Sequence, residues 1–163
     1  MLIHLDENEE RSALDAARRR QSGASGNRNR YGAVKNRSRD EDLLIHLQGC
    51  RGELAAGKAY QVPALLHVNT YHSVADIGTA GEVRTRSNPG WDLIVRPADP
   101  ADRYYVLVIG SCMSGTALDV IGGIWGLDAR KKEYVADYGG YGSSWFVPQE
   151  ALEPPEKIPP GWL

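Results

Sequence analysis

The 163-residue sequence contains only two cysteines and no long hydrophobic run. Cys50 and Cys112 lie far apart and outside any CxxC or CxxH spacing, so the sequence indicates neither a zinc site nor a disulfide framework. The longest apolar stretches, such as VLVI, are far too short to span a membrane. The first residues, MLIHLDENEERS, are too acidic for a signal peptide, and their apolar run is too short. We therefore expect a cytoplasmic protein without a membrane partner.

Acidic residues are missing from residues 18–39, a stretch that contains eight basic ones. These are Arg18, Arg19, Arg20, Arg28, Arg30, Lys35, Arg37 and Arg39. The net charge is −2, yet the part from Asp40 onward has ten basic and sixteen acidic residues and therefore a formal charge of −6. A basic arm on an acidic body favours a polyanionic partner, and we expect nucleic acid because its phosphates attract such a stretch strongly. A solvated arm without a partner is the alternative.

The composition, 42% hydrophobic and 25% charged, suits one globular domain that buries its own core. We divide the chain into an N-terminal helix and basic arm (1–39), an α/β core (40–150) and a proline-rich C-terminal tail (151–163). The end of this tail, EPPEKIPPGWL, has four of the nine prolines and reads as an extended arm or linker.

Two helices are expected before any strand. Residues 5–20 have acids in the first turns and arginines in the last, which complements the helix dipole. In the second helix, residues 40–60, apolar side chains recur at helical spacing and predict a narrow core-facing stripe. The stripe consists of Leu43, Leu47, Cys50 and Leu54. Three glycines weaken this helix, so we expect another element to approach it closely there. They are Gly49, Gly52 and Gly57.

Strands dominate the second half. Residues 92–97 and the continuous apolar run 104–110 predict strands, the latter central and covered on both faces. Residues 116–127 predict a strand broken by its glycine pair, residues 128–135 a short polar helix, and residues 143–152 a final extended stretch. The order predicts an α+β fold in which a mixed sheet is flanked by helices.

The sequence DIGTAGEVRTRS (76–87) indicates a tight hairpin with unusual charges. A turn after Ile77 makes Asp76 and Glu82 near cross-strand partners, and two facing carboxylates repel unless a cation or a bound metal lies beside them. Mg²⁺ is typically held by one or two carboxylates, water and phosphate oxygens. Glu82 and Arg84 share one face of the strand, and Glu53 of the preceding helix can supply a third acid. A solvated hairpin with an arginine–carboxylate pair is the alternative.

This layout resembles the PD-(D/E)XK nuclease superfamily, whose pattern is a helix with an acid, a strand with Asp and a strand with Glu-x-Lys. The segment GELAAGKAY supplies Glu53, VADIG supplies Asp76, and GEVRT supplies Glu82 and Arg84. The resemblance covers roughly residues 27–150, and similar strings occur in small phage and bacterial proteins assigned to that fold. It implies a restriction-endonuclease-like sheet, catalysis by these four residues, and Mg²⁺ or Mn²⁺ held by the three acids. The implied substrate is DNA rather than RNA.

Arg84 stands where active members of the superfamily carry lysine. Arginine stays charged and can clamp a phosphate, but it cannot act as a base at neutral pH. Two functions therefore remain open: a metal-dependent nuclease, or a phage factor of the same fold that binds nucleic acid or a host defence complex without cutting. A homodimer is possible in either case.

Other residue types give weaker signals. His46, His67 and His72 lack metal-ligand spacing and read as structural, although His72 lies close enough to the hairpin in sequence to line the same cleft. The four tryptophans read as core or packing residues. The turn around Cys112 resembles a nucleophile turn only superficially, because no base is placed beside it.

Overall fold

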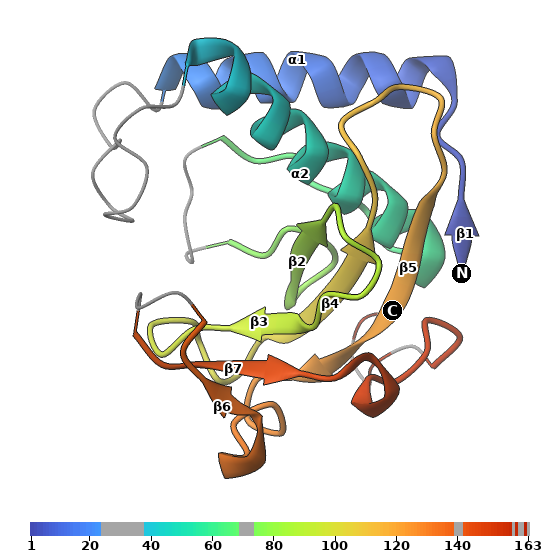
Figure 1. Ribbon diagram of the computed structural model, residues 1–163. Helices are drawn as coiled ribbons and strands as arrows, with labels where there is room; N and C mark the ends of the chain where they lie inside the picture. The colour runs from blue at the N-terminus through green and yellow to red at the C-terminus, as the bar shows by residue number, and fades with distance from the viewer. Residues whose placement is uncertain (24–37, 69–73, 139–141, 158, 160–161, 163) are drawn as a thin grey trace.

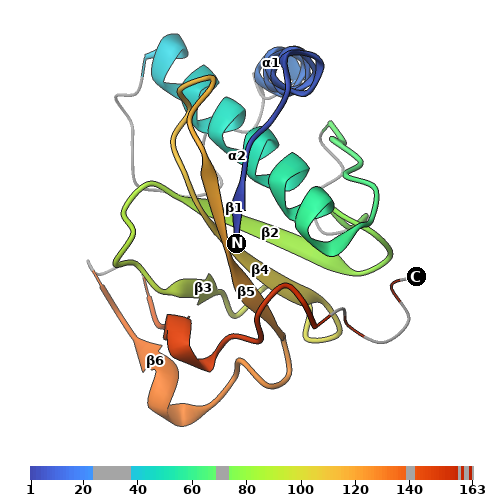
Figure 2. The ribbon, with the colours of Figure 1, turned by 90° about the vertical axis from the view of Figure 1, so that its right-hand side faces the viewer.

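The computed structural model describes residues 1–23, 38–68, 74–138, 142–157, 159 and 162. The described chain is mixed α+β, as predicted, with two α-helices and two separate sheets. Both helices lie on one side of the larger sheet, with α2 against the sheet and α1 packed on α2, and the smaller sheet lies on its other side (Figures 1 and 2). No helix in the described part of the chain is long and apolar enough to cross a membrane.

Helix α1 (Glu7–Gly23) begins at a reciprocal cap. Asp6 Oδ1 accepts hydrogen bonds from the backbone N–H groups of Asn8 and Glu9 at 2.8 and 2.9 Å, and the Glu9 carboxylate accepts from Asp6 N–H at 2.7 Å. These bonds satisfy backbone donors that the first helical turn leaves unpaired. The buried side of the helix consists of small residues, which lets α2 approach closely: Ala13, Ala16 and Ala17.

Helix α2 (Arg39–Tyr60) has a capping box at its start, where Ser38 and Glu41 bond each other's backbone N–H groups. The predicted apolar stripe is confirmed, but it packs against α1 rather than against the sheet. A second face, C-terminal to the stripe, packs on the sheet and consists of Ala55, Ala56, Ala59 and Tyr60. Helix α2 therefore lies between α1 and the sheet.

The larger sheet has the strand order β1-β5-β4-β2, and its strands are β1 (Leu2–Ile3), β2 (Gly81–Arg86), β4 (Tyr104–Ile109) and β5 (Leu118–Trp125). Strand β2 runs parallel to β4, with Glu82 opposite Tyr105, and the other pairs are antiparallel. The prediction for β4 is confirmed, because one core cluster covers each of its faces. Strand β2 lies at the edge of the sheet, so the backbone N–H and C=O groups on its unpaired side can form hydrogen bonds with the segment that precedes it.

The smaller sheet is antiparallel, with the order β3-β7-β6. Its strands are β3 (Leu93–Val95), β7 (Ser144–Val147) and the short β6 (Val135–Ala136). Leu93, Val95 and Val147 pack with Tyr105 and Leu107 of β4, so the second core cluster lies between the two sheets.

One predicted element is confirmed in part and one is wrong. Strand β5 is continuous, but its pairing with β4 shifts register at the glycine pair, where Leu107 pairs with Gly122 and Val108 with Val120. The pair also admits a neighbour, because a Cβ at Gly122 would lie 2.3 Å from the carbonyl oxygen of Glu153. Residues 128–135 do not form a helix. Ala129 is buried in the core between the sheets, Lys131 is extended, and only a 3-10 turn follows, η3 (Lys132–Tyr134).

The C-terminal tail is not the extended arm that its prolines suggest. After η4 (Gln149–Ala151), Glu153 exchanges two backbone hydrogen bonds with Gly123, at 2.8 and 2.9 Å. Trp162 is 5% exposed, and its ring centre lies 5.3 Å from those of both Tyr60 and Tyr104. The tail is therefore anchored to the main core at both positions.

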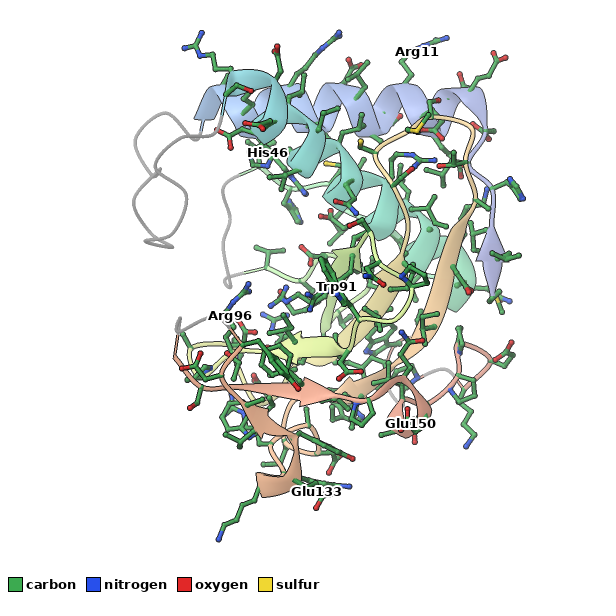
Figure 3. The ribbon with its side chains drawn as sticks, viewed as in Figure 1. Arg11, His46, Trp91, Arg96, Glu133 and Glu150 are labelled. Atoms are coloured by element: carbon green, nitrogen blue, oxygen red, sulfur yellow. The ribbon has the colours of Figure 1, made fainter. Side chains whose placement is uncertain are left out.

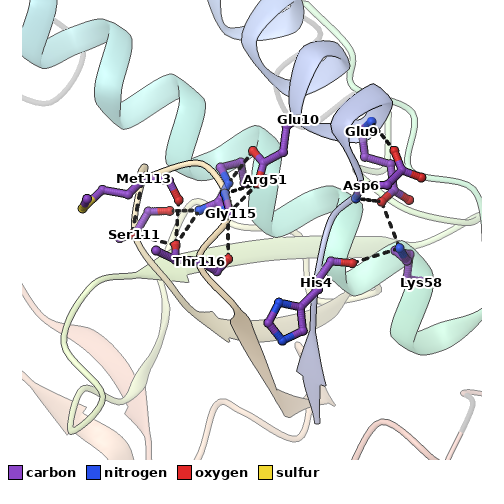
Figure 4. A network of polar contacts seen from close by, with 10 residues as sticks. All are labelled: His4, Asp6, Glu9, Glu10, Arg51, Lys58, Ser111, Met113, Gly115 and Thr116. Carbon is purple, nitrogen blue, oxygen red and sulfur yellow. Dashed lines mark hydrogen bonds and ion pairs between the residues drawn. The ribbon is translucent and has the colours of Figure 1, made fainter.

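A buried arginine fixes α1 against α2 (Figure 4). The Arg51 side chain is fully buried, and its guanidinium binds both carboxylate oxygens of Glu10 at 2.8 and 2.9 Å. The same guanidinium donates to backbone carbonyls of Ser111 and Thr116 in the loop between β4 and β5. Glu10 also accepts from Gly115 N–H at 3.0 Å. This network holds the N-terminal half of α1, whose other end reaches the candidate site.

Candidate metal and phosphate site

The predicted turn is present between Asp76 and Glu82. Asp76 N–H donates to the carbonyl of Gly81 at 2.8 Å, Gly81 N–H donates to Ile77 at 3.0 Å, and Gly78 has a φ of 54°, which glycine adopts easily. Ile77 and Gly81 form an antiparallel bridge, so Asp76 and Glu82 are neighbours across the turn. The repulsion is relieved in part because the Asp76 carboxylate turns to the strand edge, where Oδ2 accepts from the N–H of Val83 at 2.8 Å.

Alternate residues of β2 face opposite sides of the sheet. Val83 packs with the core cluster under α2, and the side chain of Thr85 lies against Gly52 of α2. Glu82 and Arg84 share the other face, where Arg84 Nη1 lies 3.6 Å from Glu82 Oε2. The strand thus separates Glu82 from the face covered by α2, the helix that carries Glu53.

Arg84 has a second carboxylate partner, Asp99, which the sequence did not indicate as part of the site. Arg84 Nη2 lies 3.1 Å from Asp99 Oδ2, and the guanidinium carbon lies 5.3 Å from the centre of the Tyr105 ring. Burial alone would lower the pKa of Arg84, but Asp99 and Glu82 outweigh it and the pKa is raised. Arg84 therefore remains charged between two acids. Asp99 is buried, with 4% of it exposed, and the sequence alone does not reveal this burial.

Glu53 is buried, and it is paired with an arginine that we expected to belong to the nucleic-acid-binding arm. Arg20 Nη1 and Nη2 bind Glu53 Oε1 and Oε2 at 2.6 and 2.8 Å, and Arg20 Nε donates to the carbonyl of His67 at 2.8 Å. Burial alone would lower the pKa of Arg20, but the hydrogen-bonded Glu53 outweighs it and the pKa is raised. The last turns of α1 thus place a charged group in the candidate site.

Asp76 links the two other acids electrostatically. Burial and, after it, the nearby negative charge of Asp76 raise the pKa of Glu82 to about 7, although Arg84 opposes both effects. Burial likewise raises the pKa of Glu53 to about 7, opposed by Arg20 and assisted by Asp76. Two carboxyls with such pKa values around a third are typical of functional sites, although structural ion pairs also perturb pKa values.

The geometry favours one cation position rather than a cluster of three acids. In the residues that the structure describes, no group of three or more His, Cys, Asp or Glu side chains can hold a metal ion. The reason is local: Arg20 occupies both oxygens of Glu53, on the other side of β2 from Glu82. Glu82 Oε1, by contrast, is buried without a hydrogen-bond partner in the described structure. One unpaired carboxylate oxygen beside a second acid fits Mg²⁺, which commonly takes one or two carboxylates.

The basic arm is described only in part. Arg18, Arg19 and Arg39 are exposed at the ends of the two helices, and Arg18 makes one long contact of 4.0 Å with Asp15. The other predicted nucleic-acid contacts lie outside the described residues: Arg28, Arg30, Lys35 and Arg37. Their role stays a prediction, as does that of His72, which also lies outside the described residues.

Trp91 departs from the expectation that all four tryptophans are packed, because it is 46% exposed.

Comparison with protein families, with curated proteins and with solved structures gives no match. The chemistry of the site is therefore the basis for the function proposed below.

Proposed function

We propose that this protein is a metal-dependent nuclease of the PD-(D/E)XK type that hydrolyses phosphodiester bonds in DNA. The observation that carries the proposal is the state of Glu82: its carboxyl is buried, its pKa is raised to about 7, and Oε1 has no hydrogen-bond partner in the described structure. A divalent cation beside Asp76 would offset both the burial of this carboxylate and its repulsion by the neighbouring acid.

Asp76 and Glu82 would hold the ion, and Mg²⁺ or Mn²⁺ bound there supplies charge neutralisation and an activated water. The remaining work falls to the protein. Arg84 shares a face with Glu82 and keeps its charge at every working pH, so it can contact the scissile phosphate and stabilise the charge that develops there. Arginine stays protonated at neutral pH, so Arg84 cannot act as the general base.

Glu53 lies on the other side of β2 from Glu82, so it would join the metal ligands only after release from Arg20 and a movement toward the strand edge beside Asp76. The pair is bidentate and largely buried, so release needs a new partner for each member. A divalent ion can replace the guanidinium at Glu53, and a DNA phosphate can replace the carboxylate at Arg20. Substrate and metal would thus support one another in opening this pair.

A second function is favoured by the same ion pairs. Arg20 and Arg84 already form ion pairs with Glu53, Glu82 and Asp99 without any metal. Under this alternative the acids are structural, and the protein binds DNA or a host defence complex without cutting, with its basic arm as the contact surface.

Cleavage assays with a matched control distinguish the two functions. Supercoiled and linear DNA are incubated with Mg²⁺ or Mn²⁺ and with the wild type, Glu82→Gln or Glu133→Gln, the last removing an exposed acid from η3. We expect the wild type and Glu133→Gln to cleave and Glu82→Gln to be inactive. No cleavage by the wild type with either metal contradicts the enzyme, and cleavage that persists in Glu82→Gln contradicts the site.

A further inference from the structure

An exposed tryptophan and an arginine are stacked at the end of β2 away from the turn. Trp91 is 46% exposed, and the guanidinium carbon of Arg86 lies 4.5 Å from the centre of its ring. Arg86 Nη1 also donates to the carbonyl of Asp92 at 3.1 Å, which fixes the guanidinium beside the ring. The exposed part of the ring is thus next to a positive charge.

The turn that carries Trp91 is held by hydrogen bonds on both sides. Asn88 Oδ1 accepts from Gly90 N–H at 2.9 Å, and the Asn88 carbonyl accepts from Trp91 N–H at 3.2 Å. Gln149 Nε2 donates to the carbonyls of Pro89 and Trp91 at 2.7 and 3.0 Å. The indole is therefore presented on an ordered backbone, so a ligand that stacks on it pays little to order the turn.

A second arginine adds to the positive charge. Burial lowers the pKa of Arg86, and the nearby charge of Arg96 lowers it further, opposed by Asp92. Arg96 is exposed, and its N–H donates to Asp99 Oδ2 at 2.9 Å, which ties its backbone to the acid that pairs with Arg84. In Figure 3 the side chains of Trp91 and Arg96 both lie between α2 and β3. Aromatic faces that stack bases, with cations for the phosphates, are how proteins bind single-stranded nucleic acid.

The cluster lies in line with the candidate site. Glu82, Arg84 and Arg86 alternate along β2 and therefore share one face. Four residues of strand span ~13 Å between Glu82 and Arg86. Successive phosphates of one strand advance ~3.4 Å along the axis of duplex DNA and are farther apart along the strand itself, so that distance corresponds to at most about four nucleotides.

We propose that Arg86, Trp91 and Arg96 form a subsite for an unpaired segment of nucleic acid, with a base stacked on Trp91 and phosphates bound by the two arginines. The position of the cut relative to this subsite rests on the proposed nuclease function. The substrate would then be a DNA with unpaired nucleotides beside the scissile phosphate. Binding at the subsite needs neither metal nor cleavage, so it can be tested when the metal site fails.

Fluorescence anisotropy in EDTA measures the subsite alone. The probes are a labelled oligothymidylate of about twelve nucleotides, an abasic oligonucleotide of the same length and a duplex. The variants are Trp91→Ala and the double variant Arg86→Gln/Arg96→Gln, with two controls. Tyr138→Ala removes another exposed aromatic, which contacts Phe146, and Arg11→Gln removes an exposed arginine of α1. Circular dichroism checks that every variant is folded.

We expect Trp91→Ala to bind the oligothymidylate roughly 5- to 150-fold more weakly, the range for loss of one stacked base, with no change for the abasic probe or the duplex. The double arginine variant should bind both single-stranded probes more weakly. The number of counterions released on binding, measured from the salt dependence of the affinity, should fall by about two. Wild-type affinity in Trp91→Ala, an equal loss in Tyr138→Ala, or an equal loss for the abasic probe overturns the subsite. So does a wild type that binds no single strand. A DNA cleavage result changes none of these outcomes.

Discussion

The guanidinium of Arg20 binds both carboxylate oxygens of Glu53, at 2.6 and 2.8 Å, and joins the end of α1 to the middle of α2. The two side chains are 16% and 7% exposed, so water does little to solvate either charge alone. The pair therefore has two roles: it fixes α1 at the candidate site, and it neutralises the buried carboxylate of Glu53.

Replacing Arg20 should destabilise the protein in a pH-dependent way. In Arg20→Gln, Glu53 is left buried without its cation, which costs about 3 kcal/mol when the carboxyl is ionised. At about pH 5 Glu53 keeps its proton, because its pKa is raised to about 7 even with Arg20 present, and the cost should be small. Urea unfolding from about pH 5 to 9 measures the difference.

Arg19→Gln is the matched control, because Arg19 is an exposed neighbour on the same helix. Its stability should follow that of the wild type at every pH. The double variant Arg20→Gln/Glu53→Gln should recover most of the loss above pH 7. If Arg20→Gln lowers the unfolding free energy equally at every pH, the lost contact between the helices, and not the unpaired charge of Glu53, is the cause.

Stability should fall as pH rises from about 4.5 to 7, because of Glu82. The folded-state pKa of about 7 exceeds the ordinary value of 4.5, so across this window the folded protein binds more protons than the unfolded chain. Glu82→Gln removes the titration and should stabilise the metal-free protein at about pH 8 by 2 to 3 kcal/mol. Urea titrations of both proteins in EDTA check the slope. A variant that loses stability at high pH as steeply as the wild type would show that Glu82 is not the group responsible.

Arg84→Lys tests which property of Arg84 matters. One ammonium cannot reproduce the two separate contacts to Glu82 and Asp99, so the unfolding free energy should drop by about 1 to 2 kcal/mol. Cleavage should stay within about tenfold of the wild type, since the charge remains, whereas Arg84→Met should lose about 100-fold or more. Single-turnover cleavage of linear DNA provides the comparison. Equal rates for Arg84→Met and the wild type would remove Arg84 from the catalytic residues.

Gly52 should tolerate no side chain, in contrast to Gly49 on the same helix. A Cβ at Gly52 would lie 1.8 Å from Thr85 Oγ1, while a Cβ at Gly49 meets nothing within 4 Å. Gly52→Ala should therefore cost about 1 to 3 kcal/mol, and Gly49→Ala should be neutral or stabilising by up to about 1 kcal/mol. Thermal unfolding compares them, and Gly52→Ala/Thr85→Ala should recover part of the loss. Similar unfolding temperatures for the two single variants would contradict the close packing of α2 on β2.

Local signals in the sequence predict local structure well. The charges at its two ends predict the first helix, periodicity predicts the second, and the unbroken apolar run predicts β4. The turn that brings Asp76 beside Glu82 follows from the glycines around it. The residues 128–135 mislead, because burial of Ala129 between the sheets overrides a helix-like pattern of charges. Periodicity describes one segment at a time, so it cannot report which side of a sheet a neighbouring element occupies.

The partners of the site residues could not be predicted in the same way. Arg20 and Glu53 are 33 positions apart, and the ion pair depends on how α1 crosses α2. Asp99 lies in the connection between β3 and β4, 15 positions after Arg84, and reaches it only through the fold. Such pairs arise from tertiary packing, and the charged residue types alone leave many pairings possible.

The proposed divalent cation between Asp76 and Glu82 is tested most directly by an anomalous diffraction measurement. Crystals of the wild type and of Glu82→Gln are soaked with Mn²⁺ above pH 7, where the Glu82 carboxyl is ionised. We expect an anomalous peak within ligand distance of both carboxylates in the wild type and no such peak in Glu82→Gln. A wild-type map without density between these two carboxylates, or a peak that persists unchanged in Glu82→Gln, would contradict the site.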